Sequence, residues 1–354
     1  MRHGSHRPSA GLDRWFSSQI ENLDPGCFAQ VMATGVISSA LLLMGFSEVS
    51  IVMFDINLVV YLWLFILTLL RSLCFPSRLW ADLIDPRRSF AFFTLVAATN
   101  VVAIRLDLPD QTFVPLTLWL SAFSLWLFLI YFCFAVVAFT NTSKGADIVH
   151  GGWIVAIVAT QSLVILGQLI AARLGPLGSA MLVLAHILWG LGLGLYGVFI
   201  VLLCNRILYF PLALEDITPA LWIVMGAAAI TANAGSVLVL ANPDLPYLQH
   251  MQPFVDGVTL LMWAWATWWI FFLLLLAAWK HLVWRAPITY APMLWSLVFP
   301  IGMYALANLR LSLAAHFAVL QSASRVIVWI ALSVWIVTTA GLIKTLWRSI
   351  WSPS

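Results

Sequence analysis

The chain has 354 residues, of which 63% are hydrophobic and 9% are charged. Soluble domains carry roughly 25% charged residues, so this composition excludes a fold that is exposed to water on all sides. The formal net charge is only +3, so the places where charges lie say more than their sum. We therefore expect an integral membrane protein without a large soluble domain.

Residues 1–24 are expected to form a cytoplasmic N-terminal tail, because they carry several charges and no apolar run typical of a secretory signal. Apolar side chains between Leu12 and Leu23 recur at helical spacing, which predicts a short amphipathic helix over residues 11–24. This helix could lie at the membrane interface, or it could be an ordinary leader with no special role.

Ten apolar segments follow, each long enough to cross about 30 Å of hydrocarbon as a helix. They lie near residues 27–47, 50–71, 89–107, 113–140, 149–172, 177–204, 217–241, 254–279, 291–312 and 322–345. We expect one transmembrane domain over residues 25–347 and a cytoplasmic C-terminal tail over residues 348–354. The stretch 311–321 could extend the ninth crossing or form an outer loop.

The basic residues predict the orientation. If the N-terminus is cytoplasmic, four of the 17 Lys and Arg residues fall outside, namely Arg105, Arg173, Arg310 and Arg325, and the other thirteen fall inside. Basic residues are enriched in cytoplasmic loops, so both termini are expected in the cytoplasm.

Odd and even crossings differ in composition. The second crossing is nearly all aliphatic and aromatic between Leu58 and Leu70, whereas odd crossings carry more Thr, Asn, Gln, Gly and Pro at mid-depth. Polar groups in hydrocarbon are costly unless they face the interior of a bundle. The prediction is an all-α membrane fold in which the odd helices form an inner ring around a central pore.

A short repeat supports pairing of the crossings. An Ala-Thr step followed by Gly, Asn or Gln ends at Gly35, Asn100 and Gln161, and a looser version runs from Thr231 to Asn233. This recurrence predicts five helical hairpins with polar groups at one depth. The expected pore-lining residues are Thr34, Gly35, Thr99, Asn100, Thr160, Gln161, Thr231 and Asn233. The alternative is that each threonine bonds to a carbonyl one turn earlier in its own helix.

The ninth crossing contains the predicted gate. Its sequence is interrupted by Pro292, Pro300 and Gly302, and proline removes a backbone donor and kinks a helix. Phe299 precedes the central proline, near the position to which the repeat projects. A bulky apolar ring can block a narrow pore by its size and by dewetting. We expect Phe299, Pro300 and Gly302 to form the gate, with plain core packing as the alternative for Phe299.

Four arginines could form an outer vestibule that attracts anions. Arg105, Arg173 and Arg310 end the third, fifth and ninth crossings, and Arg325 begins the tenth. Clustered cations raise the local concentration of anions. The alternative is that they offset helix macrodipoles, with Asp107 or Asp110 as a partner of Arg105.

No Asp or Glu lies at mid-depth in any crossing, where proton-coupled transporters usually carry a titratable relay. This favours passive conduction. The four cysteines lack metal-ligand spacing, and no motif of a hydrolase, metalloprotease or phosphate-binding loop appears in context. We expect no catalytic residue, metal, cofactor or nucleic-acid partner.

Four stretches carry a family resemblance: DPGCFAQVMATGVISSA (24–40), PRRSFAFFTLVAATNVV (86–102), ITPALWIVMGAAA (217–229) and LWSLVFPIGMYALAN (294–308). They resemble the tellurite-resistance/C4-dicarboxylate transporter family, which includes plant slow-type anion channels and fungal malate and sulfite transporters. The resemblance runs from about residue 24 to 345. It implies ten helices in five hairpins, a homotrimer with one pore per subunit, and a phenylalanine that occludes the pore, here Phe299.

The sequence therefore predicts an anion channel or facilitator in the cell (inner) membrane, with a small anion and the lipid bilayer as partners. The alternative is a coupled exporter of a small anion such as a C4-dicarboxylate, sulfite or tellurite. A membrane scaffold or enzyme without a pore is a third reading.

Overall fold

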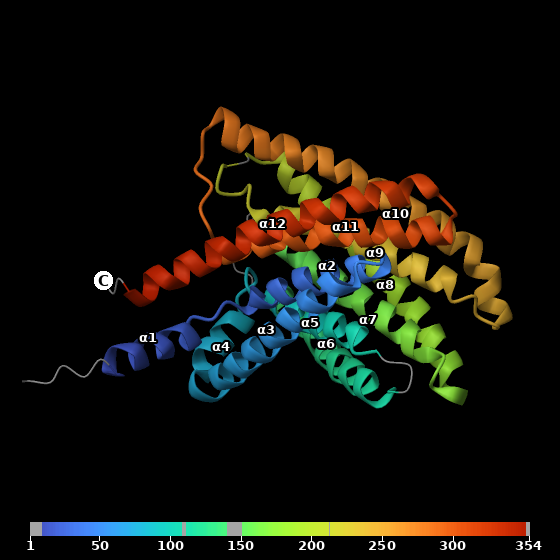
Figure 1. The fold of residues 1–354 in the computed structure, drawn as a ribbon, viewed down its shortest axis with the longest axis horizontal. Helices are drawn as coiled ribbons and strands as arrows, with labels where there is room; N and C mark the ends of the chain where they lie inside the picture. The colour runs from blue at the N-terminus through green and yellow to red at the C-terminus, as the bar shows by residue number, and fades with distance from the viewer. Residues whose placement is uncertain (1–8, 108–110, 140–150, 212, 352–354) are drawn as a thin grey trace, which may run out of the picture.

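The computed structural model describes residues 9–107, 111–139, 151–211 and 213–351. Within these ranges the regular structure is helical, with twelve α-helices and no strand (Figure 1). The α-helices are α1 Ser9–Glu21, α2 Ala29–Leu43, α3 Ser47–Cys74, α4 Pro76–Leu83, α5 Phe93–Arg105, α6 Phe113–Phe139, α7 Val155–Ala171, α8 Gly178–Tyr209, α9 Ile223–Leu240, α10 Pro246–Ala278, α11 Trp295–Ala314 and α12 Ala318–Trp351.

Nine segments of the described chain are long and apolar enough to cross a membrane. The third predicted crossing is shorter and corresponds to the helical segment Ser89–Arg105. The prediction of an all-helical, multi-pass membrane protein is confirmed. Between residues 311 and 321, α11 continues to Ala314 and α12 begins at Ala318, so a tight connection joins the two helices.

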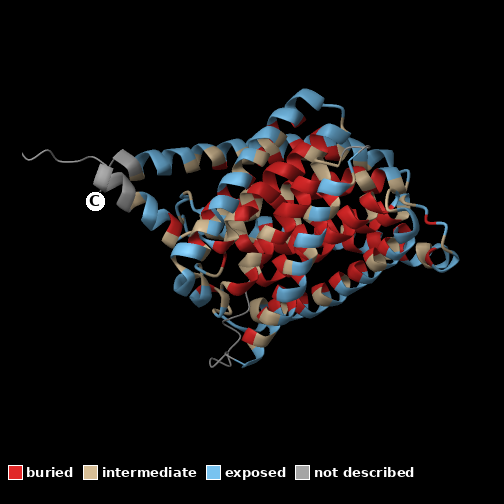
Figure 2. Ribbon diagram, turned by 90° about the horizontal axis from the view of Figure 1, so that it is seen from below, coloured by how far each residue is buried: buried red, intermediate tan, exposed pale blue. Residues whose placement is uncertain are grey.

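The helices form two layers around one axis. Contacts between α2 and α5, α5 and α7, α7 and α9, α9 and α11, and α11 and α2 close a ring of five inner helices. The helices α3, α6, α8, α10 and α12 each pack against the inner helix that precedes them in the chain. Figure 2 shows the buried residues gathered in the middle and the exposed ones on the outside.

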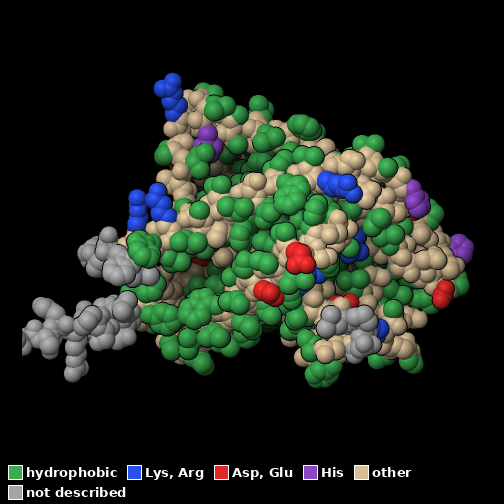
Figure 3. Space-filling view, viewed as in Figure 1, with side chains coloured by type: hydrophobic (Ala, Val, Ile, Leu, Met, Phe, Trp, Pro, Cys, Tyr) green, Lys and Arg blue, Asp and Glu red, His purple; other side chains and the backbone are tan. Residues whose placement is uncertain are grey.

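Burial follows composition. Every residue of α9 from Ile223 to Leu238 is buried, as expected for a helix surrounded by other helices. The outer helices expose large apolar side chains, such as Val59 on α3 and Phe271 on α10. Hydrophobic side chains accordingly cover much of the face shown in Figure 3. Such a surface suits hydrocarbon, whereas the Thr, Asn and Gln residues of the inner helices are kept away from it.

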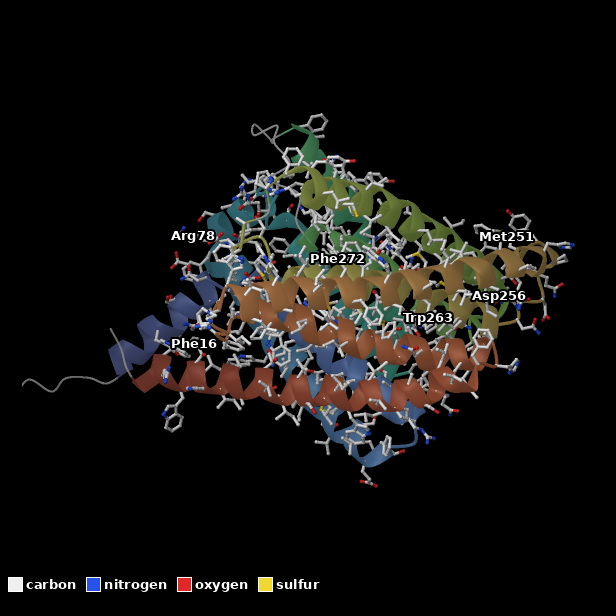
Figure 4. All side chains as sticks on the ribbon, turned by 90° about the horizontal axis from the view of Figure 1, so that it is seen from above. Phe16, Arg78, Met251, Asp256, Trp263 and Phe272 are labelled. Atoms are coloured by element: carbon white, nitrogen blue, oxygen red, sulfur yellow. The ribbon has the colours of Figure 1, made fainter. Side chains whose placement is uncertain are left out.

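The predicted N-terminal helix is present as α1 and packs on α3, where the rings of Phe16 and Trp63 lie 6.2 Å apart. Glu21 at its end binds Arg78 of α4 at 2.9 Å. Figure 4 places Phe16 and Arg78 at one end of the molecule and Met251 and Asp256 at the opposite end. The C-terminus lies at the same end as α1 (Figure 1).

Candidate functional site

Each inner helix is preceded by a short 3-10 turn. The turns are η1 Pro25–Phe28, η2 Ser89–Phe92, η4 Gly151–Ile154, η6 Pro219–Trp222 and η8 Pro292–Leu294. They contact one another in the same closed order as the helices that follow them. Five helix N-termini therefore meet at one end of the axis. Free backbone N–H groups and the helix macrodipole make such an end favourable for anions.

A cavity of about 310 Å³ opens among these turns, and we call it the wide cavity. Its walls include Gly26 in η1 and one residue from each of the other inner helices, namely Thr94, Val155, Ile223 and Ser296. Two arginines, Arg87 and Arg88, and one carboxylate, Asp24, also border it. The side chains that line the wide cavity thus carry a net charge of +1, and the helix N-termini add partial positive charge.

Ion pairs hold one of these arginines in place. Arg88 binds Asp82 of α4 at 2.6 Å and lies 3.8 Å from Asp24. Asp82 is buried and also binds Arg71 of α3 at 2.6 Å. Arg87 is exposed at the cavity. Asp82 therefore fixes Arg88, while the side chain of Arg87 is left at the mouth of the wide cavity.

A second, smaller cavity of about 30 Å³ is lined by all five inner helices, and we call it the narrow cavity. Each helix contributes two residues three positions apart, and α11 adds Arg310. The pairs are Val36 and Ser39, Val101 and Ile104, Ser162 and Ile165, Ile230 and Asn233, and Met303 and Leu306. Residues three apart share a helix face, so these pairs mark the face that each inner helix turns to the axis.

Phe299 lies between the two cavities. On α11, Ser296 borders the wide cavity and Met303 borders the narrow one, and Phe299 is about one turn from each. Its side chain is 1% exposed. One turn before the narrow cavity, the other inner helices place Met32, Ala97, Val158 and Gly226, all of which are buried. These buried residues lie at a level between the residues that border the wide cavity and those that border the narrow cavity.

Small residues allow α11 to approach its neighbours closely at this level. A Cβ atom on Gly226 of α9 would lie 2.9 Å from Cγ of Pro300, and one on Gly302 would lie 3.0 Å from Cγ1 of Ile37 in α2. The helix α11 continues through Pro300, which cannot donate a hydrogen bond to the carbonyl of Ser296. The proline therefore frees one carbonyl group on a residue that borders the wide cavity.

The predicted pore-lining threonines lie at contacts with the outer helices. The Thr34 hydroxyl accepts from Nε1 of Trp335 at 2.8 Å, and the Thr160 hydroxyl accepts from Nε1 of Trp126 at 2.8 Å. The hydroxyl of Thr99 lies 3.0 Å from that of Tyr61. Neither the wide nor the narrow cavity is lined by these residues. Their role in a pore stays a prediction.

The same pattern extends around the whole ring. Trp189 of α8 donates to the backbone carbonyl of Thr231 in α9 at 3.2 Å, and Trp263 of α10 donates to the side chain of Asn308 in α11 at 3.0 Å. An aromatic side chain of each outer helix thus makes a hydrogen bond to the inner helix that follows it in the chain. The last outer helix, α12, makes its hydrogen bond to the first inner helix, α2. Sequence reasoning missed this set, although one aromatic N–H or O–H group on every outer helix was a signal for it.

The predicted amides divide between helix contacts and the axis. Asn100 donates to Ser162 at 2.9 Å, and Gln161 donates to the carbonyl of Trp189 at 3.3 Å. Gly35 lies against Val101, whose Cγ1 atom would be 2.3 Å from an added Cβ. Asn233 borders the narrow cavity. Of the eight predicted lining residues, the structure brings Asn233 to this cavity.

The four predicted vestibule arginines do not meet at one place. Arg310 borders the narrow cavity. Arg105 donates to Ser50 at 3.2 Å and lies 5.2 Å from the ring centroid of Phe54. Arg173 binds Asp107. Arg325 is exposed near the start of α12. Asp110, the other suggested partner of Arg105, lies outside the described residues.

Within the described part of the chain, no group of three or more His, Cys, Asp or Glu residues is placed to bind a metal. The four cysteines are free thiols. The chemistry of the axis is therefore that of hydroxyl, amide and guanidinium groups beside apolar side chains.

Comparison with known proteins matches residues 22–343 to the family described as voltage-dependent anion channel. An uncharacterized transporter of Methanocaldococcus jannaschii is 26% identical over 338 residues, which cover 93% of this chain and 95% of that protein. An uncharacterized membrane protein of Mycobacterium tuberculosis is 39% identical over 145 residues, which cover 41% of this chain and 73% of that protein. A protein of Arthroderma otae named sulfite efflux pump is 24% identical, with 94% of this chain and 95% of that protein covered.

Proposed function

Because the chain belongs to the voltage-dependent anion channel family, we propose that it conducts a small anion across the cell membrane along the axis of its five inner helices. The family carries anions and is not a family of enzymes. The observation that carries this proposal is the pair of cavities on one axis. All five inner helices line the narrow cavity, and four of them, together with the turn η1 that precedes α2, line the wide cavity.

The charges along the axis support an anion rather than a cation. Arg87, Arg88 and the five helix N-termini lie at the wide cavity, and Arg310 lies at the narrow cavity. The residues that line the narrow cavity include no carboxylate. Cations at both ends of an apolar passage raise the local concentration of anions and exclude cations.

Phe299 is the proposed gate. Its side chain is 1% exposed and lies about one turn from a residue at each cavity, at a level where Ala97 and Gly226 are small. An anion passing this level would need the ring to move or the packing to open. The role of Pro300 and Gly302 in this proposal is to keep α11 close to α9 and α2.

Ten crossings in five hairpins, with the odd helices innermost, are part of this proposal. The shortest crossing, Ser89–Arg105, combines four residues of 3-10 helix with thirteen of α-helix. At the usual rises it spans about 27 Å, close to the thickness of the hydrocarbon core. The positive-inside bias places the wide cavity and both termini in the cytoplasm.

The test replaces Phe299 with alanine in protein reconstituted into liposomes. Flux of chloride, nitrate or sulfite should rise severalfold above wild type, because the ring that separates the cavities is gone. Phe199→Ala is the matched control, since it removes a buried phenyl ring from the outer helix α8. Equal flux in wild type and Phe299→Ala, with both proteins folded, would refute the gate.

A coupled exporter is the second candidate, and the relative named sulfite efflux pump favours it. Coupling and channel conduction differ in one measurable way. Vesicles with an imposed pH gradient should accumulate sulfite against its own gradient only if transport is coupled. Equilibration without accumulation favours the channel.

We also propose a homotrimer, in keeping with the family resemblance and with the apolar outer faces of helices such as α3 and α10. Native mass spectrometry from mild detergent should give a mass of three chains. A single-chain mass under the same conditions would contradict the trimer.

A further inference from the structure

Arg310 is a cation without a counter-ion in the described part of the chain. It lies in the last two turns of α11, is half-buried and borders the narrow cavity. Its Nε atom is buried and has no hydrogen-bond partner among the described residues. None of the ion pairs found within the described ranges includes Arg310.

Elsewhere the fold supplies partners for its half-buried and buried arginines. Arg71 pairs with Asp82, Arg173 with Asp107, and Arg206 with Asp216. Arg105 has no such pair, and its Nε also lacks a partner, but its guanidinium donates to a serine hydroxyl and lies over an aromatic ring. An unpaired cation in a membrane interior is costly, so residues of this kind usually have a partner or a function. The missing partner of Arg310 therefore needs an explanation.

The walls of the narrow cavity offer a second polar group that lacks a partner. Asn233 is 2% exposed, and its Oδ1 atom has no hydrogen-bond partner among the described residues. The Oδ1 atom is an acceptor, so an anion in the cavity would be bound by the two N–H groups of the Asn233 amide. The hydroxyls of Ser39 and Ser162, which also border the cavity, donate to carbonyls of their own helices. A guanidinium and an amide thus face one small space on the axis.

We propose that the narrow cavity is a binding site for one small inorganic anion, such as a halide, with Arg310 as its counter-ion and Asn233 as a second donor. This site deepens the proposed function and rests on it for the route by which the anion arrives. The anion compensates the charge that no described residue balances. Phe299 separates the site from the wide cavity, so the bound anion lies on the far side of the proposed gate.

The size of the site selects the substrate class. About 30 Å³ is room for a water-sized group. A halide fits such a space after losing most of its water, and a four-carbon dicarboxylate does not. With the gate in this closed position, the site therefore takes compact inorganic anions and rejects C4-dicarboxylates. This separates two substrate classes that the family resemblance left together.

The first test measures binding without transport. The melting temperature of the purified protein is compared in sodium chloride, bromide, malate and gluconate at equal ionic strength. Chloride or bromide should raise it by about 2 °C or more over gluconate, because a ligand that binds the folded state stabilises it. Malate should not raise it. Arg310→Gln should lose the shift, and in gluconate it should be at least as stable as wild type, because its unpaired charge is gone.

The second test measures transport in the Phe299→Ala background. Arg310→Gln should lower chloride flux by about tenfold or more, and Arg310→Lys should restore part of it, because loss of a buried charge partner weakens anion binding strongly. Arg348→Gln is the control, since it removes the same charge from an exposed position on α12. It should change neither flux nor melting temperature.

The outcomes separate the site from the channel. The binding site is supported, and the channel is contradicted, if halide raises the melting temperature only when Arg310 is present and Phe299→Ala shows no anion flux. The site is overturned, whether or not anions flow, if halide does not change the melting temperature of the wild-type protein. It is also overturned if halide raises the melting temperature of Arg310→Gln as much as that of wild type. Stabilisation by malate equal to that by chloride overturns the substrate class.

Discussion

The hydroxyl group of each inner-helix threonine is already engaged in the folded protein. Thr160 donates to the carbonyl of Ala156 at 2.8 Å and accepts from Nε1 of Trp126 at the same distance. Thr34 and Thr99 also donate to carbonyls one turn earlier in their own helices. A hydroxyl with both functions occupied at a helix contact contributes to packing of the two layers. In this conformation it is not free to bind an anion.

Thr160→Val tests this assignment at the scale of one residue. Valine keeps the shape but leaves the buried N–H of Trp126 unpaired, which should cost about 1–3 kcal/mol of stability. Thr160→Ser should cost less because it retains the acceptor. Thermal unfolding in detergent measures the difference, and anion selectivity in the Phe299→Ala background should stay the same. A change in selectivity with no loss of stability would restore the pore-lining role.

At the scale of elements, the ends of α3, α4 and η2 are joined by one buried carboxylate. Asp82 binds Arg71 and Arg88, and the side chains of Asp82 and Arg71 are 7% and 4% exposed. This contact fixes the element that carries Arg88 at the edge of the wide cavity. The arrangement of that cavity thus depends on a short helix, α4, that crosses no membrane.

Asp82→Asn should lower stability by about 3–5 kcal/mol, because it leaves a buried arginine without its counter-charge. A lowered melting temperature in detergent is the expected result. Asp85→Asn serves as the control, because Asp85 lies just after α4 and its substitute can still accept the hydrogen bond from the backbone N–H of Arg87 through an amide oxygen. Equal melting temperatures for the two variants would show that the buried contact is dispensable.

At the scale of the whole molecule, the exposed thiol of Cys74 reports the orientation in the membrane. Cys74 ends α3 beside α4, at the end of the molecule that carries α1 and the wide cavity. Cys133 is buried and the other two cysteines are partly buried. A probe attached to Cys74 therefore marks the side on which the wide cavity opens.

In a variant that retains only Cys74, a membrane-impermeant maleimide should label inverted vesicles and spare intact spheroplasts, because the positive-inside bias places this end in the cytoplasm. Cys74→Ser in the same background should remain unlabelled in both preparations. Labelling of intact spheroplasts would reverse the proposed topology. The wide cavity would then face outward.

The proposed gate shows how far sequence reasoning could reach. The repeat pointed to the neighbourhood of Phe299, but the structure places that residue level with Met32, Ala97, Val158 and Gly226. Thr34, Thr99 and Thr160 lie two positions farther along their helices than those neighbours, which turns them away from the axis. The proline and the surrounding sequence identified the residue, while its level in the ring followed from packing.

The sequence by itself determined the class of the protein, the approximate place of its crossings and its family. The class and the crossings depend on the length of apolar runs and on the charges at their ends, which a bilayer constrains along one dimension. The family resemblance depends on the particular residues of four short stretches, at 24–40, 86–102, 217–229 and 294–308. Only the tertiary structure decided which face of each inner helix meets the axis. A helix that is buried all round, such as α9, has almost no polar face to reveal its orientation. For the same reason, only the packed ring could show that Arg310 and Asn233 share one small cavity while the threonines join the two layers.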